Sequence, residues 1–271
     1  MVTILISSAL LLYLVASGVL ARSFAGGGDA GPRTGTMVAA LGVALHGAAL
    51  AAFTALHNEL PLVGLAPSLA TLGFLIGVFL LVTTITNARP VGLVLVPVMA
   101  VLAGLALVLG LQPTGEDLAF RGVWFAFHVL AAFIGYAGLT VAFAAGLLYL
   151  LQFRELKGKR LGRIFRFFPA LPTLDLLGRW SVAIGFATLT LALLLGWGWT
   201  VRFQQTLAPG NPQVIWGVIT WFAFAAMLGA RAWGTAGRER RAALASVIGF
   251  TVVVLVYVVL RLSVVAGSVF L

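Results

Sequence analysis

The chain contains three histidines, His46, His57 and His128, and each lies within or at the end of a long apolar segment. An ionisable ring is costly in the hydrocarbon core of a membrane, so its presence there indicates a function. Neutral imidazole is a common metal ligand, and two imidazoles can take both axial positions of a haem iron. Haem is favoured over zinc, because no acidic residue falls inside an apolar segment to complete a four-ligand zinc site.

The spacing of the histidines predicts which of them meet. His46 and His57 are eleven residues apart, about three helical turns, so both project from nearly one face. From the predicted membrane surface, His46 lies about 16 Å below His57, and His128 about 8 Å deep on another helix. The faces that carry His46 and His128 are rich in alanine and glycine, which allow close approach of a backbone or a flat ligand. We predict that His46 and His128 are the axial ligands of a noncovalently bound haem b, with His57 as the substitute.

Aromatic and basic residues gather on the side predicted to be outside. Tryptophan favours membrane interfaces, so an aromatic belt is the simpler interpretation, and a shelf for a porphyrin face is the functional one. Arginine can clasp a carboxylate through two hydrogen bonds, so Arg202 or Arg121 could hold a haem propionate, although either could also be a snorkelling loop residue. The tryptophans expected beside the outward opening are Trp197, Trp199 and Trp216.

The composition shows which elements must position these residues. The chain has 271 residues, of which 62% are hydrophobic and 9% charged, far from the composition of a soluble domain. A helix needs about 20 apolar residues to cross the hydrocarbon core. We predict a single all-α integral membrane domain, residues 1–271, with eight transmembrane helices. The predicted spans are residues 2–20, 37–57, 68–86, 91–111, 123–153, 179–201, 212–231 and 243–263.

The distribution of basic residues predicts the orientation. Loops after the odd-numbered spans hold 14 of the 17 Lys and Arg residues, which places both termini on the outer side of a bacterial-type inner membrane. The net charge of +10 then reflects contact with anionic lipid headgroups, and no motif for nucleic-acid binding accompanies it. Residues 21–36 are predicted to be a flexible cytoplasmic linker, and residues 154–178 a basic cytoplasmic loop with a helical start.

The residue types also exclude several kinds of chemistry. The chain has no cysteine, which excludes disulfides, thiolate metal sites and covalent haem attachment to this chain. No nucleophile is placed beside a base, so we expect no enzymatic reaction. A transporter is a weaker alternative, because broken helices and charges at mid-membrane are not evident.

Several segments resemble the CcsA/YpjD/HemX-like branch of the cytochrome c assembly protein family. They are VALHGAAL around His46, VWFAFHVLAAFIGYAGLTVAFAAGLLYLLQFRELKGKR around His128, and the later FPALPTLDLLGRWSVAIGFATLTLALLLGWGW and QVIWGVITWFAFAAMLGARAWGTAGRERR. The resemblance implies an eight-span membrane protein that binds haem and serves cytochrome c biogenesis. It also implies a separate membrane partner and apocytochrome c as partners, besides lipid and haem.

One departure from the family pattern keeps a second hypothesis open. Haem-delivery members carry an aspartate after the tryptophan-rich segment, whereas GWGWTV here lacks it. The alternative is therefore a cofactor-free structural or regulatory membrane subunit that retains the fold.

Overall fold

The computed structural model describes residues 1–26, 31–113, 118–159, 162–202, 212–232 and 237–263. Within these residues, eight helices are long and apolar enough to cross a membrane, which confirms the all-α integral membrane class. The elements are α1 (Val2–Gly26), α2 (Gly31–His57), α3 (Leu65–Thr83), η1 (Arg89–Val91), α4 (Gly92–Leu109), α5 (Leu118–Lys157), α6 (Arg163–Phe167), α7 (Leu171–Arg202), α8 (Pro212–Ala232) and α9 (Arg238–Ser263).

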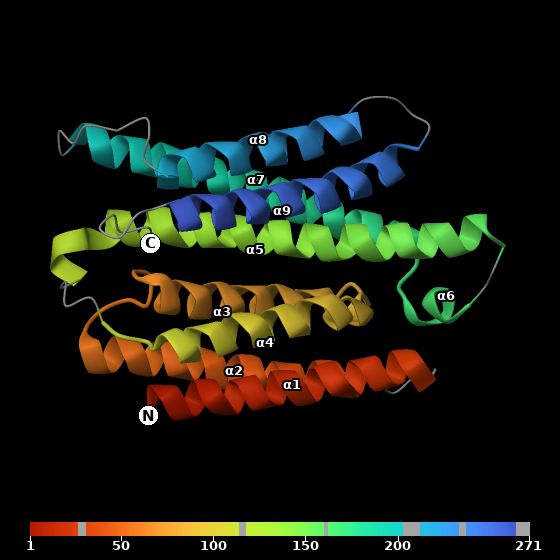
Figure 1. The fold of residues 1–271 in the computed structure, drawn as a ribbon, viewed down its shortest axis with the longest axis horizontal. Helices are drawn as coiled ribbons and strands as arrows, with labels where there is room; N and C mark the ends of the chain where they lie inside the picture. The colour runs from red at the N-terminus through yellow and green to blue at the C-terminus, as the bar shows by residue number, and fades with distance from the viewer. Residues whose placement is uncertain (27–30, 114–117, 160–161, 203–211, 233–236, 264–271) are drawn as a thin grey trace.

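The helices pack in two groups (Figure 1). Helices α1 to α4 pack on one another, and α5, α7, α8 and α9 form the second group. The two groups meet mainly where α5 packs on α3. The short helix α6 also joins them, because its neighbour Phe168 stacks on Phe24 of α1 at 5.7 Å between ring centroids.

The bundle has two distinct ends (Figure 1). We call the end with the start of α1 and the last turns of α9 the terminal end, and the opposite end the α6 end. The terminal end also holds His57 and Arg202, the last residues of α2 and α7. The α6 end holds the basic last turn of α5 with Arg154 and Lys157. Positive charge is therefore concentrated at the α6 end.

The two predicted connecting segments contain more helix than expected, and the helical start predicted for residues 154–178 is present. The expected linker at residues 21–36 is helical at 21–26 and again from 31, so that only residues 27–30 lie outside the described residues. The expected loop at residues 154–178 contains the last turn of α5, all of α6 and the first eight residues of α7. Helical hydrogen bonds satisfy much of the backbone in the described parts of both segments.

A glycine marks where the fifth span begins. Gly122 has φ 62° and ψ 171°, so α5 is broken there and runs straight only from Val123. Only glycine adopts such a backbone at little cost. The prediction that this span starts at Val123 is confirmed.

Glycines also set the distance between α5 and α7. A Cβ on Gly138 would lie 2.9 Å from the carbonyl oxygen of Ser181, and a Cβ on Gly135 would lie 3.3 Å from that of Gly185. Because the opposing atoms are backbone, a side chain could be admitted only by moving a helix. The α5–α7 contact therefore depends on the absence of side chains at these positions.

We expect Gly138→Ala to lower the free energy of unfolding in mixed micelles by about 1–3 kcal/mol, the usual cost of overpacking. Gly18→Ala is the matched control, because a Cβ on Gly18 meets nothing within 4 Å. The control should be neutral or slightly stabilising, since alanine favours a helix over glycine. Equal stability of the two variants would contradict the close α5–α7 contact.

Candidate functional site

His128 is held against α7 near the terminal end. Its Nδ1 lies 2.7 Å from the carbonyl oxygen of Ala192. A carbonyl oxygen only accepts, so Nδ1 carries the proton and the neutral ring keeps its lone pair on Nε2. Metal-binding histidines are oriented in this way, by a hydrogen bond from the other ring nitrogen to a backbone carbonyl or carboxylate. His128 is thus the predicted site residue whose geometry suits a ligand.

The glycines of the GWGW segment create the space for this arrangement. A Cβ on Gly196 would lie 2.9 Å from Cε1 of His128, and a Cβ on Gly198 would lie 3.0 Å from Cζ2 of Trp124. The indole of Trp124 donates from Nε1 to the carbonyl oxygen of Leu195 at 2.8 Å. The two glycines therefore receive the ring of His128 and the indole of Trp124 from α5. Sequence reasoning considered the tryptophans of this segment and missed its glycines, whose spacing of two residues was the available signal.

His46 lies in the core of the first helix group. It is fully buried, and its Nδ1 shares a hydrogen bond of 3.2 Å with the hydroxyl of Tyr13 in α1. The edge of its ring meets Phe74 of α3 at a centroid distance of 6.1 Å. Its Nε2 is buried without a hydrogen-bond partner among the described residues. Such an atom is costly in an apolar core, so His46 is a second polar site, held by α1, α2 and α3.

The structure does not bring His46 and His128 together. Five residues of α5 share a core with α1–α4, namely Ala137, Val141, Ala144, Leu148 and Tyr149. The first four follow His128 by about 2.5, 3.6, 4.4 and 5.6 helical turns, so they lie on the face of α5 opposite to it. His128 accordingly points towards α7, away from the helix group that contains His46. In the part of the chain that the structure describes, no hydrogen bond or ring contact links the two histidines.

His57 ends α2 at the terminal end of the bundle. Its side chain is exposed, and its ring lies 4.8 Å from that of Phe53 between centroids. An exposed imidazole at a helix C-terminus interacts favourably with the helix dipole. This contact gives His57 a local partner on its own helix and leaves it separate from His46.

The tryptophans divide into two environments. Trp197 is 62% exposed near the end of α7, and Trp199 is half-buried two residues further along. Trp216 instead packs between helices: its ring stacks on Tyr136 of α5 at 4.3 Å, and its Nε1 donates to the carbonyl oxygen of Val253 in α9 at 3.2 Å. The ring of Trp216 therefore joins α5, α8 and α9, and its position beside an opening stays a prediction.

The two arginines that were predicted to hold a haem propionate take no part in these contacts among the described residues. Arg202 is exposed in the last turn of α7 and forms no ion pair among the described residues. The side chain of Arg121 lies outside the described residues.

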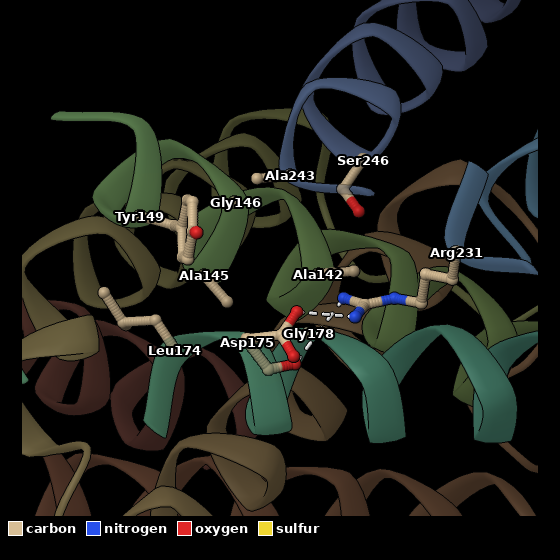
Figure 2. Close-up of a pocket in the computed structure, with 10 residues that line it drawn as sticks. All are labelled: Ala142, Ala145, Gly146, Tyr149, Leu174, Asp175, Gly178, Arg231, Ala243 and Ser246. Atoms are coloured by element: carbon tan, nitrogen blue, oxygen red, sulfur yellow. Dashed lines mark hydrogen bonds and ion pairs between the residues drawn. The ribbon is translucent and has the colours of Figure 1, made fainter. Parts of the chain in front are cut away.

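A polar cluster at the α6 end was missed from the sequence. Arg231 of α8 donates from Nη1 to Oδ1 of Asp175 in α7 at 2.6 Å, and their side chains are 15% and 23% exposed. Figure 2 shows this pair between Tyr149 of α5 and Ser246 of α9, so that four helices converge on it. The sequence assigned Asp175 and Arg231 to loops or helix ends, and gave no signal that they would meet across 56 residues.

A comparison with known families identifies the chain. The family model described as "Cytochrome C assembly protein" matches residues 38–265. The chain belongs to this family. The matched region includes both His46 and His128, and membership agrees with the resemblance found in the sequence.

Curated relatives with the name cytochrome c biogenesis protein CcsA are also similar to parts of the chain. The protein of Guillardia theta is 30% identical over 154 residues, that of Prochlorococcus marinus (strain MIT 9312) 32% over 160, and that of Chlamydomonas reinhardtii 29% over 138. These matches cover 51%, 51% and 50% of this chain, and 51%, 51% and 37% of the relatives. The chain spans about half the length of the curated relatives it matches.

We expect Tyr13→Phe to reduce the free energy of unfolding by about 1 kcal/mol, because it removes the hydrogen bond to His46 and leaves both ring nitrogens unpaired. Tyr136→Phe is the matched control, since the Tyr136 hydroxyl forms no hydrogen bond among the described residues, while its ring, like that of Tyr13, contacts another aromatic ring. Unfolding in mixed micelles measures both. A loss in the control as large as in Tyr13→Phe would show that the hydrogen bond to His46 contributes nothing.

Proposed function

We propose that this protein binds haem b noncovalently and passes it on during the assembly of c-type cytochromes, as a carrier without a reaction of its own. The observation that carries the proposal is the orientation of His128, whose Nδ1 is tied to the Ala192 carbonyl while Nε2 keeps its lone pair. Membership of the cytochrome c assembly family supports the same function.

The residues around His128 fit a bound haem. His128 would supply an axial nitrogen, and the small side of α7 at Gly196 keeps its ring in place. The exposed Trp197 would offer an aromatic face near the outer opening, and Arg202 or Arg121 would pair with a propionate. When bound, haem supplies a redox-active iron whose protein ligand and surroundings set its potential.

The proposal does not require His46 or His57 as a second ligand of the haem iron. A single histidine is sufficient to hold a haem iron, as in globins. The opposite faces of α5 argue against an iron shared by His46 and His128 in this arrangement of helices. His46 would instead keep a separate function within the first helix group.

The location and partners follow from the same proposal. The basic α6 end would face the cytoplasm, and the terminal end, with the start of α1 and the last turns of α9, would face outward across a bacterial-type inner membrane. Haem held near His128 would then be close to the outer surface, where apocytochrome c and a separate membrane partner would receive it.

A second candidate function has one observation in its favour. His46 and His128 face different helix groups, and both rings already have protein hydrogen-bond partners. This arrangement also suits a cofactor-free structural or regulatory subunit that retains the family fold.

We expect purified protein reconstituted with haem to show a Soret band that His128→Ala largely abolishes, because the axial nitrogen is lost. His57→Ala should keep the band, and His46→Ala should keep it while lowering stability. Absorption spectra of oxidised and reduced protein measure this. Equal loss of the Soret band in His46→Ala and His128→Ala would support the original prediction that both histidines bind one iron. Wild-type protein that stays colourless in excess haem would favour the cofactor-free subunit.

A pair of glycine variants tests the positioning of His128 without removing it. Gly196→Ala should weaken haem binding and shift the Soret band, because the added Cβ would displace the imidazole. Gly198→Ala, two residues further along α7, is the matched control, since its Cβ would displace only Trp124. Identical spectra for the two variants would show that the place of the ring on α7 is irrelevant to haem.

The absence of cysteine allows a direct test of orientation. Single cysteines in place of the exposed Gln112 and Lys157 mark the terminal end and the α6 end. A membrane-impermeant maleimide should label Gln112→Cys in intact cells and Lys157→Cys only after the membrane is opened. The reverse pattern would place the termini inside and contradict the proposed direction of haem delivery.

A further inference from the structure

A groove of about 490 Å³ lies at the α6 end, far along α5 and α7 from His128. Its walls come from the end of α5, the start of α7 and the start of α9. The lining residues are Tyr149, Leu171, Pro172, Asp175, Leu176, Arg179 and Glu239. The groove therefore combines an apolar side, formed by α7, with charges of both signs, and it is independent of the haem proposal.

The charges of the groove are arranged for a ligand that is itself both positive and negative. Asp175 uses Oδ1 for Arg231, and its other carboxylate oxygen accepts no hydrogen bond among the described residues. Among the described residues, the ion-pair partner of Glu239 is a distant arginine, Arg238 at 3.7 Å. Arg179 is exposed and has no ion pair in the described part of the chain. Carboxylate oxygens and a guanidinium are thus both available to a ligand.

The position of the groove relative to the membrane surface indicates that its ligand is an amphiphile. Helix α7 has 32 residues, which at about 1.5 Å each is roughly 48 Å, against a hydrocarbon core of about 30 Å. If α7 is centred, about 9 Å at each end lies among the headgroups, which places Leu171 to Leu176 there. Trp180, 58% exposed one turn further along, suits the boundary between headgroups and acyl chains.

We propose that this groove binds a phospholipid whose headgroup carries a primary ammonium, of the phosphatidylethanolamine class. Arg179 pairs with the phosphate, and the carboxylates of Glu239 and Asp175 accept hydrogen bonds from the ammonium. Leu176, where α7 enters the hydrocarbon core, contacts the start of the acyl chains, and Arg179 reaches back to the headgroup layer through its long side chain. A choline headgroup has the same charge and no N–H donor, and a glycerol headgroup has no positive charge, so both lose the charge-assisted hydrogen bonds.

Native mass spectrometry of the full chain tests this with three lipids that share their acyl chains and differ in headgroup: ethanolamine, choline and glycerol. We expect about tenfold stronger retention of the ethanolamine lipid than of the choline lipid, the effect of one charge-assisted hydrogen bond. Equal retention of these two lipids by the wild-type protein would overturn the proposal, and so would a preference for the glycerol lipid, which would indicate a general attraction to the basic end.

Two variants locate the effect in the groove. Glu239→Gln should reduce the preference for the ethanolamine lipid, with Asp175 left as the remaining carboxylate, and Arg179→Gln should weaken retention of both lipids by loss of the phosphate contact. Arg166→Gln on α6 is the matched control, because it removes a positive charge at the same end outside the groove. An unchanged ethanolamine preference in Glu239→Gln would overturn the proposal. If a variant fails to fold, the comparison of lipids on the wild-type protein still tests it.

Competition distinguishes a lipid from a soluble ligand with the same head chemistry. Phosphoethanolamine, which has the headgroup without acyl chains, should displace the bound lipid only in large excess. Displacement at equal concentrations would assign the groove to a soluble zwitterion and overturn the lipid proposal.

Discussion

The close contact of α5 and α7 is the constraint on which the rest of the structure depends. Gly135 and Gly138 face the backbone of α7, and Gly196 and Gly198 of α7 face the side chains of α5. In a bilayer the hydrophobic effect does little to drive helices together, so close packing of small residues and hydrogen bonds between helices must do so. The same contact orients His128 and Trp124 at one end and brings Asp175 beside the end of α5 at the other.

Three ring N–H groups in this bundle donate to backbone carbonyls of neighbouring helices. His128 donates to Ala192, Trp124 to Leu195, and Trp216 to Val253. These carbonyls already belong to helices, and a second donor from another helix satisfies a ring N–H without breaking the helix that accepts it. The arrangement has a chemical consequence for His128, because the carbonyl decides which ring nitrogen is free. For Trp124 and Trp216 the consequence is mechanical, since the bonds hold neighbouring helices together.

The division into two helix groups separates two histidines that the sequence predicted to share one haem iron. His46 belongs to the first group through Tyr13 and Phe74, and His128 belongs to the second through α7. The basic α6 end is likewise more than a solvated surface, because Asp175 and Arg231 form a partly buried pair where four helices meet. Truncation of either partner of such a pair leaves the other charge uncompensated, which is more costly than the pair is favourable.

The sequence by itself determined the class of fold and the number of spans, because a long apolar run can cross a bilayer only as a helix. It placed the start of the fifth span at Val123 and predicted His128 as a site residue, since ionisable rings are rare at membrane depth. Only the tertiary structure decided that His128 faces α7 while His46 faces α1 and α3, that Trp216 joins helices, and that Asp175 meets Arg231. Helical periodicity states which residues share a face, but the neighbour that each face meets depends on packing between helices distant in the chain, which no local pattern records.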